Sequence, residues 1–259
     1  QVDLGRMKCI ARNECQKGCS LGAYFSTQSA TLPAAANTGN LYIAPNSVVE
    51  SLIYDANTNR VRGVRVVDNE TMLQREYFGK IIFLCASTLG TTQIMLNSKS
   101  RRFPNGIANS SGVLGHYLMD HNYNAMVTAD IDGYEDEYYS GRRPASLYIP
   151  NWHYEPSRYH RDFKRGYALA GSASRVDWQD MGVTDGFGTS FKAKLHNPGT
   201  WMMGLQGQGE MLANRDNQVS LSATEKDKWG MPQLHFNCRW SDNEIAMTDA
   251  AVDTAATMM

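Results

Sequence analysis

The stretch from residue 40 to residue 67, NLYIAPNSVVESLIYDANTNRVRGVRVV, decides the fold prediction for this chain of 259 residues. It holds runs of β-branched and aromatic residues cut by Asn, Asp, Pro and Gly, a pattern typical of strands joined by turns. The runs predict strands at 41–43, at Val48–Tyr54 and at Val61–Val67, with a turn at Asn57–Asn59 before the last. We therefore expect a β-sheet with a hairpin in this half of the chain.

A second apolar run, KIIFLCAS at residues 80–87, predicts a strand that ends in small residues. Four consecutive apolar residues, Ile81 to Leu84, suit a strand that is covered on both faces. A helix is expected next, with Ser87 or Thr88 as its N-cap. Open α/β sheets bind ligands where such a strand gives way to a helix, because the backbone can approach a ligand closely there. The turn Cys85–Ser87 is therefore a candidate ligand-binding site.

Strands dominate the sequence beyond residue 123. Several successive strands with few helices predict an antiparallel sheet. Ser241 and Glu244 form a capping box that predicts a helix running to Met259. The fold class that we expect for the whole chain is α+β. The predicted strands are Tyr123–Ile131, Ser146–Trp152, Gly166–Val176, Thr200–Leu212, Gln218–Ala223 and Leu234–Trp240.

The composition is that of an ordinary globular protein and excludes several classes of function. Hydrophobic residues make up 42% and charged residues 20% of the chain, which is enough apolar material for a sizeable core. A net charge of −1 gives no reason to expect nucleic acid or an anionic membrane as partner. No apolar run approaches the roughly 18 residues of a membrane span, so no membrane insertion is expected. No histidine has the partners of a hydrolase triad at recognisable spacing.

The five cysteines fall into two groups. Cys85 and Cys238 lie in predicted strands and are expected to be small buried core residues. Cys9, Cys15 and Cys19 are close enough in sequence to share one ligand, and thiolates at short loop spacing are the usual ligands of iron–sulfur clusters. Zinc is disfavoured because a closed zinc site needs four ligands and no histidine lies nearby. Structural thiols or a disulfide are the alternatives to a cluster.

Several segments follow one another as they do in the glucose–methanol–choline (GMC) oxidoreductases, and the chain resembles this family over nearly its whole length. The order of the segments is more specific than any one of them. Tyr24 departs from the family pattern, where Lys is common, and Thr92 stands where Pro is usual. The matching segments are Gly18–Ala23, Asn40–Asp55, Ala86–Ser98, Gly115–His121, Gly209–Glu210, Asn217–Leu221 and Asp227–Pro232.

The resemblance implies an FAD-dependent enzyme that oxidises CH–OH groups of alcohols or sugars by hydride transfer to the flavin. Val49 corresponds to the family's valine whose backbone meets the adenine, and Cys85, Ala86 and Ser87 fill the turn that passes near the cofactor. Residues 1–122 would form part of an α/β FAD-binding lobe. Residues 123–259 would form a substrate domain, an antiparallel sheet with helices on one side that covers the flavin ring.

The chain lacks the G-x-G-x-x-G fingerprint that holds a dinucleotide pyrophosphate at a helix N-terminus. In the family the fingerprint lies upstream of the matching segments, and the catalytic histidine lies beyond the position of Met259. We therefore expect these residues to be an interior segment of a longer enzyme, inactive by itself, and we assign it no catalytic residue.

The resemblance also implies partners. Some GMC dehydrogenase subunits that pass electrons to a cytochrome carry a similar cysteine cluster, so a cytochrome or other electron-acceptor subunit is one expected partner. The other is a small alcohol or sugar substrate. Two rival interpretations stay open: a non-catalytic α+β binding or scaffold module, and an FAD oxidase of the cholesterol- or pyranose-oxidase type.

Overall fold

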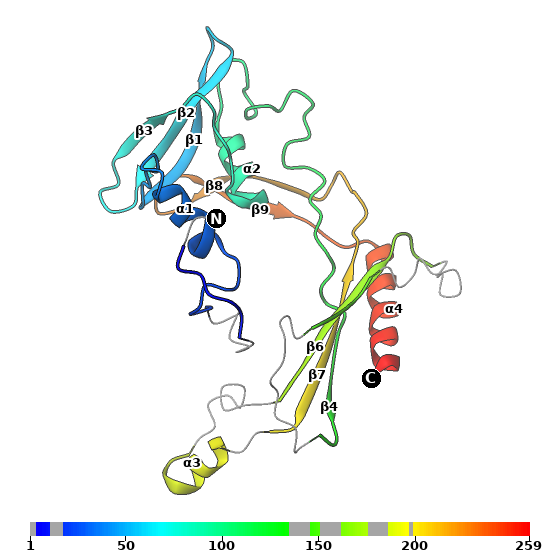
Figure 1. The fold of residues 1–259 in the computed structure, drawn as a ribbon. Coiled ribbons are helices and arrows are strands. Elements are labelled where there is room, and N and C mark those ends of the chain that lie inside the picture. The colour runs from blue at the N-terminus through cyan, green and yellow to red at the C-terminus, as the bar shows by residue number, and fades with distance from the viewer. Residues whose placement is uncertain (1–3, 11–17, 135–145, 151–161, 176–185, 197–198) are drawn as a thin grey trace. The chain divides into compact units, whose positions relative to one another are not determined.

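The computed structural model describes residues 4–10, 18–134, 146–150, 162–175, 186–196 and 199–259 (Figure 1). The contacts within the chain divide it into two compact units. Unit 1 comprises residues 1–41, 121–211 and 241–259, and unit 2 comprises residues 42–120 and 212–240. Each unit is therefore assembled from segments that are distant in sequence.

Unit 2 contains a three-stranded antiparallel sheet in the order β1-β2-β3. The register places Val49 opposite Val66 and Ser51 opposite Arg65, so Glu50 is an extra residue that forms a β-bulge. A helix, α2, and a β-hairpin complete the unit (Figure 1). The elements are β1 (Ser47–Asp55), β2 (Arg60–Asp68), β3 (Gln74–Phe78), α2 (Ser87–Asn97), β8 (Gln218–Lys226) and β9 (Pro232–Asn237).

Side-chain hydrogen bonds join these elements across long sequence separations. The Ser98 hydroxyl, just after α2, accepts from the backbone N–H of Leu52 in β1 at 2.8 Å. The Gln93 amide in α2 donates to the backbone carbonyl of Pro232 at 2.8 Å. The Trp229 indole N–H donates to Asn69 at 3.0 Å, which ties the β8–β9 hairpin to the loop after β2. Helix α2 is thus held between the three-stranded sheet and the hairpin.

The strands predicted at 41–43 and within 80–87 are wrong. Both segments run without any ladder partner among the described residues, and Ile81 and Phe83 are 73% and 82% exposed. A strand needs a neighbour for its backbone N–H and C=O groups, and no described segment supplies one here. Cys85 is exposed for the same reason. Cys238, one residue beyond the end of β9, is exposed too, as are the last residues of that strand.

Unit 1 is built on a four-stranded antiparallel sheet in the order β4-β7-β6-β5, with helix α4 on one face. The predicted capping box begins α4, since Glu244 accepts a hydrogen bond from the Ser241 N–H at 2.8 Å. The elements are η2 (Thr27–Thr31), α1 (Leu32–Ala36), β4 (Met126–Ile131), β5 (Leu147–Ile149), β6 (Tyr167–Arg175), α3 (Gly188–His196), β7 (Trp201–Gly209) and α4 (Asp242–Met258).

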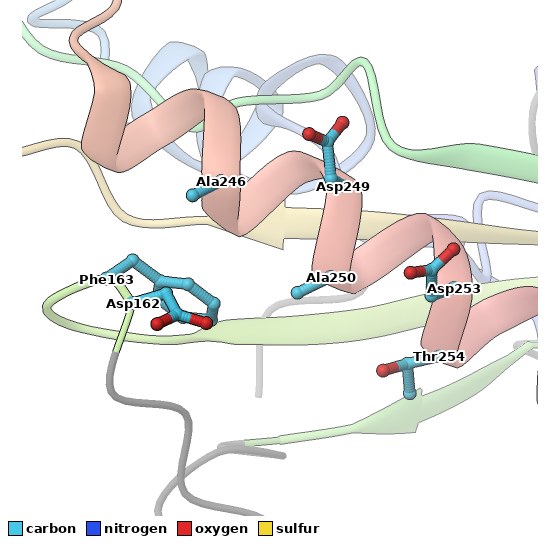
Figure 2. Close-up of a pocket in the computed structure, with 7 residues that line it drawn as sticks. All are labelled: Asp162, Phe163, Ala246, Asp249, Ala250, Asp253 and Thr254. Atoms are coloured by element: carbon cyan, nitrogen blue, oxygen red, sulfur yellow. The ribbon is translucent and has the colours of Figure 1, made fainter.

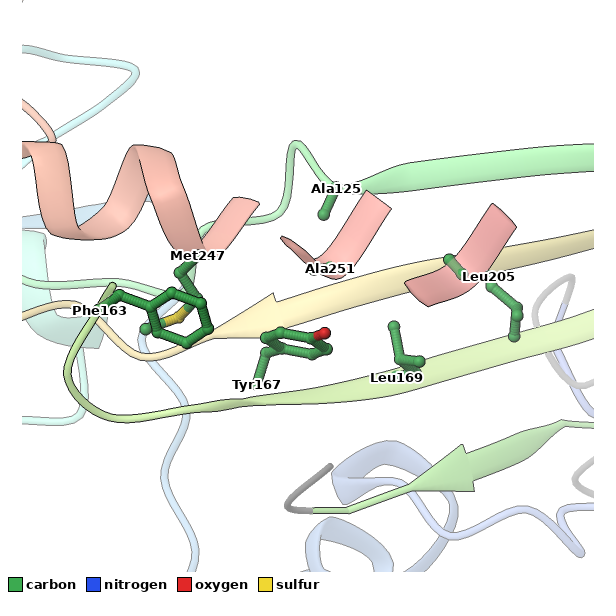
Figure 3. Packing of buried hydrophobic residues seen from close by; sticks show 8 residues of the cluster. Ala125, Phe163, Tyr167, Leu169, Leu205, Met247 and Ala251 are labelled. Carbon is green, nitrogen blue, oxygen red and sulfur yellow. The ribbon is translucent and has the colours of Figure 1, made fainter. Parts of the chain in front are cut away.

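The core of unit 1 lies between α4 and the sheet (Figure 3). Leu169 and Leu205 from the strands and Met247 from α4 are all 1% exposed or less. A Cβ atom on Gly207 would lie 2.8 Å from the Cβ of Ala125 and 2.9 Å from that of Ala251, closer than real Cβ atoms approach. The helix therefore packs directly on the backbone of β7.

A buried asparagine fastens the end of this packing. Asn122 is fully buried, and its amide donates to the backbone carbonyl of Glu244 at 3.0 Å and to the Thr248 hydroxyl at 2.8 Å. Its backbone N–H donates to the carbonyl of Gly209 at 3.1 Å. Asn122 therefore links the segment before β4 to both the end of β7 and the first turns of α4.

The α+β class is confirmed, as are the strands expected after residue 123 and the C-terminal helix. Two of the predicted strands extend to Trp152 and Val176, which lie outside the described residues. The sequence patterns did not indicate β3, α1 or α3. Strand β3 reads QREYF and is almost wholly exposed, so it lacks the apolar alternation that marks a half-buried strand.

Replacing Gly207 by Ala should destabilise unit 1 by about 1–3 kcal/mol, the usual penalty for overpacking a tight core. The added methyl group meets two Cβ atoms that belong to backbone-fixed positions. Urea denaturation measures the effect. Gly204→Ala in the same strand is the control, because the nearest atom to its added Cβ lies at 3.8 Å. Equal stability of the two variants would contradict the packing described here.

Candidate functional site

The first candidate region lies in unit 2, on the edge strand β1. This strand pairs only with β2, so one of its edges is free of strand partners among the described residues. Val49 is half-buried and lies at the β-bulge of this strand. An edge strand offers backbone N–H and C=O groups to whatever lies beside it. The geometry thus permits the backbone contact that the sequence predicted for Val49, and that contact stays a prediction.

The turn from Cys85 to Ser87 forms the N-terminal end of α2, and all of its residues are exposed. Ala86 is the N-cap, so the predicted serine or threonine cap is wrong, and no side chain caps the helix. The first backbone N–H groups of α2 therefore have no side-chain acceptor. Ser87 has a φ of 61°, a left-handed conformation that is strained for a residue other than glycine.

The cysteine cluster is only partly described. Cys9 and Cys19 lie in the described residues, whereas Cys15 lies outside them. Backbone hydrogen bonds, first from Tyr24 and then from Leu21, lower the pKa of the Cys19 thiol. Within the described ranges no group of three His, Cys, Asp or Glu side chains could hold a metal ion. The iron–sulfur site at Cys9, Cys15 and Cys19 stays a prediction.

The second candidate region is the face of the four-stranded sheet in unit 1 that is turned away from α4. Successive side chains of a strand point to opposite faces. Because Leu205, Gly207 and Gly209 of β7 lie against α4 or its core, Gln206 and Gln208 project from the other face. On that face Thr128 of β4 and Ser172 of β6 are exposed. We call this surface the open face.

Gly204 lies in the middle of the open face. It pairs with Thr128 on one side and with Ser172 on the other. An added Cβ atom there would find its nearest neighbour, the Thr128 methyl group, at 3.8 Å. Packing therefore does not require glycine at this position, unlike at Gly207. The result is a bare stretch of backbone with a hydroxyl side chain on each neighbouring strand.

No residue of the open face belongs to a site predicted from the sequence. A usable signal was present in the segment MMGLQGQGE at residues 202–210, where glutamine recurs every second residue in a predicted strand. Alternation of this kind places polar side chains on one face of a sheet. The glutamines of β7 could have been assigned to one surface from that pattern alone.

A groove of about 320 Å³ lies on the opposite side of the sheet, along α4 (Figure 2). Near it the Tyr167 hydroxyl contacts the Ala250 carbonyl at 3.0 Å and the Thr254 hydroxyl at 2.6 Å. Burial raises the pKa of Tyr167. The Tyr167 hydroxyl thus joins β6 to α4 beside the groove. The lining residues are Asp162, Phe163, Ala246, Asp249, Ala250, Asp253 and Thr254.

Comparison with known protein families finds a match in the N-terminal part of the chain. Residues 7–123 match the family model described as GMC oxidoreductase. This part of the chain is similar to the GMC oxidoreductases. The match includes β1 with Val49 and the turn before α2. GMC oxidoreductases bind FAD, so this match supports an FAD-binding role for this part of the chain.

Two dehydrogenases are similar to the chain. The 2-methyl-1,2-propanediol dehydrogenase of Mycolicibacterium austroafricanum is 28% identical over 205 residues, which cover 75% of this chain and 36% of that enzyme. The fructose dehydrogenase large subunit of Gluconobacter japonicus is 25% identical over 257 residues, which cover 96% of this chain and 44% of that subunit. The chain thus spans less than half the length of either relative.

The residues of unit 2 fit FAD in two respects. The free edge of β1 can meet an adenine edge with backbone groups, and the exposed, uncapped start of α2 suits a negatively charged cofactor. The small side chains of Ala86 and Ser87 let a ligand approach the backbone closely.

The part of the chain that the structure describes contains no helix with the length and apolar character of a membrane span.

The Cys19 thiol should be alkylated at lower pH than an ordinary cysteine. Its pKa is lowered by backbone N–H groups, so the reactive thiolate persists to lower pH in the folded protein and reverts to normal behaviour on unfolding. Iodoacetamide labelling across a pH series, followed by peptide mass spectrometry, measures the midpoint. Labelling of folded and urea-unfolded protein with the same midpoint would contradict the expectation, and the exposed Cys85 serves as internal control.

Proposed function

We propose that this chain is the part of an FAD-dependent dehydrogenase or oxidase that shapes the cofactor site and the substrate surface for oxidation of a CH–OH group in an alcohol or sugar. The family match over residues 7–123 carries this proposal. The names of the two relatives, a propanediol dehydrogenase and a fructose dehydrogenase subunit, support the substrate class.

In this proposal unit 2 supplies the cofactor contacts. The backbone of Val49 meets the adenine, and the turn formed by Cys85, Ala86 and Ser87 passes close to the cofactor. The strained φ of Ser87 supports a functional role, because strained backbone is concentrated at ligand sites. FAD supplies an acceptor for the hydride that leaves the alcohol carbon, while the hydroxyl proton passes to a base.

The open face of unit 1 is the proposed substrate surface. Gly204 leaves room for a small molecule over the backbone of β7, and Thr128 and Ser172 offer hydroxyl groups on either side of it. These side chains would bind and orient the substrate, and none of them is a candidate for the base. The predicted division into an FAD-binding part, 1–122, and a substrate part, 123–259, belongs to this proposal.

An electron-acceptor subunit is the proposed protein partner. One relative is named as a large subunit, which implies an assembly with other subunits in that protein. A partner of this kind would make the present enzyme a dehydrogenase, since the electrons would pass to a protein and not to oxygen.

Reoxidation of the reduced flavin tests this assignment. Anaerobic reduction of the flavin by an alcohol, followed by slow reoxidation in air, would support a dehydrogenase. Rapid reoxidation with formation of peroxide would contradict it.

Replacing Ala86 by Asp should weaken FAD binding by about tenfold, because a carboxylate in the exposed turn repels the phosphates of the cofactor. Ala86→Asn has nearly the same shape without the charge and is the matched control. FAD retention in the complete enzyme is measured by flavin fluorescence on dilution. Equal retention in the two variants would show that this turn lies away from the cofactor phosphates.

Replacing Gly204 by Val should raise KM for the alcohol substrate by about tenfold or more while leaving the folded structure intact. The new side chain has space in the protein but fills the bare backbone that the substrate would occupy. Steady-state kinetics of the FAD-loaded enzyme, with a melting curve as the folding check, provide the test. An unchanged KM in a stably folded Gly204→Val enzyme would contradict the proposal that the open face binds the substrate.

A further inference from the structure

Gln206 has an amide orientation that is fixed by a single hydrogen bond. Its Nε2 donates to the backbone carbonyl of Tyr123 at 3.3 Å. A carbonyl oxygen can only accept, so the NH2 end of the side chain must point to Tyr123 and the oxygen end must point elsewhere. No group among the described residues donates to Gln206 Oε1. The side chain therefore presents an oriented, unpaired acceptor on the open face.

The distance of this acceptor from Gly204 determines whether a molecule bound over Gly204 can contact it. Gln206 lies two residues along β7 from Gly204, a distance of about 7 Å on the same face. Thr128 and Ser172 lie on the neighbouring strands, each about 5 Å from Gly204. A molecule lying over Gly204 would thus meet hydrogen-bonding groups on several sides. Such a molecule must carry hydroxyl groups on more than one carbon to pair with them.

We infer that Gln206 determines specificity by accepting a hydrogen bond from a second hydroxyl group of the substrate, one that is not oxidised. This inference rests on the proposed function and adds the substrate class: polyhydroxylated alcohols or sugars are favoured over alcohols with a single hydroxyl. When the apolar carbon chain of an alcohol with one hydroxyl group covers Gln206 Oε1, that oxygen loses its hydrogen bond to water and gains none from the ligand. Binding of such an alcohol is therefore disfavoured.

The neighbours of Gln206 fit this role. Across the ladder it faces Met126 on β4 and Ala170 on β6. Neither side chain can donate to its oxygen, so the acceptor stays available for a ligand. Met126 is 60% exposed and offers a flexible apolar contact for the carbon skeleton of a bound substrate.

The test compares glycerol with n-propanol, which have the same carbon count, in the FAD-loaded enzyme. The wild-type enzyme should prefer glycerol in kcat/KM. Gln206→Met, which keeps the length of the side chain and removes both polar atoms, should lower kcat/KM for glycerol by about tenfold and leave that for n-propanol within about twofold. If neither compound is turned over, their inhibition constants against the working substrate replace kcat/KM.

The control is Gln233→Met. Gln233 makes the same kind of bond, from Nε2 to the backbone carbonyl of Lys226 at 3.1 Å, but it lies in unit 2. This variant should leave the glycerol to n-propanol ratio unchanged. A merely structural role for Gln206 would change both substrates equally and would overturn the inference.

The outcomes separate this inference from the proposed function. The role of Gln206 is overturned if Gln206→Met leaves the glycerol to n-propanol ratio of kcat/KM unchanged, or if the wild-type enzyme prefers n-propanol. In either case a raised KM in Gly204→Val would still support the open face as the substrate surface. Unchanged KM in Gly204→Val overturns the proposed substrate surface, and the absence of any alcohol oxidation by the complete enzyme overturns the proposed function. Either result also overturns the role of Gln206.

Discussion

The direct packing of α4 on the backbone of β7 is the constraint on which the rest of unit 1 depends. Gly207 and Gly209 remove the side chains that would hold the helix away, and Met247 and Ala251 fill the space. All of the large apolar side chains of β6 and β7 that join the core point to this one side. The other side of the sheet has no helix α4 against it, and there Gly204, Gln206, Thr128 and Ser172 lie beside the exposed Met126 on the open face.

Unit 2 shows a different balance between stability and function. Its sheet, helix and hairpin are joined by well-formed hydrogen bonds from Ser98, Gln93 and Trp229. The start of α2, by contrast, lacks a cap and holds Ser87 in a strained conformation. Natural proteins tend to break local rules at functional sites, because a satisfied backbone group is unavailable to a ligand. The uncapped start of α2 therefore leaves backbone N–H groups available to a ligand.

Sequence patterns predicted what local chemistry determines and failed where distant partners decide. The hairpin of β1 and β2 and the Ser241–Glu244 capping box depend on neighbours in sequence, and both were predicted correctly. The strand expected near Phe83 was wrong because apolar composition cannot show whether a pairing strand exists. The open face was missed for a related reason: alternation assigns Gln206 to a face, but only the packing of α4 shows which face is bare.

The extended segment from Ile81 to Leu84 has a consequence for handling the chain in solution. Four adjacent bulky residues with no charge, two of them almost fully exposed, are the composition that promotes intermolecular β-stacking. Lys80 is the one cation directly beside this run and is a weak gatekeeper against self-association. The segment that the sequence predicts to be a buried strand is therefore the segment at which aggregation of the chain would begin.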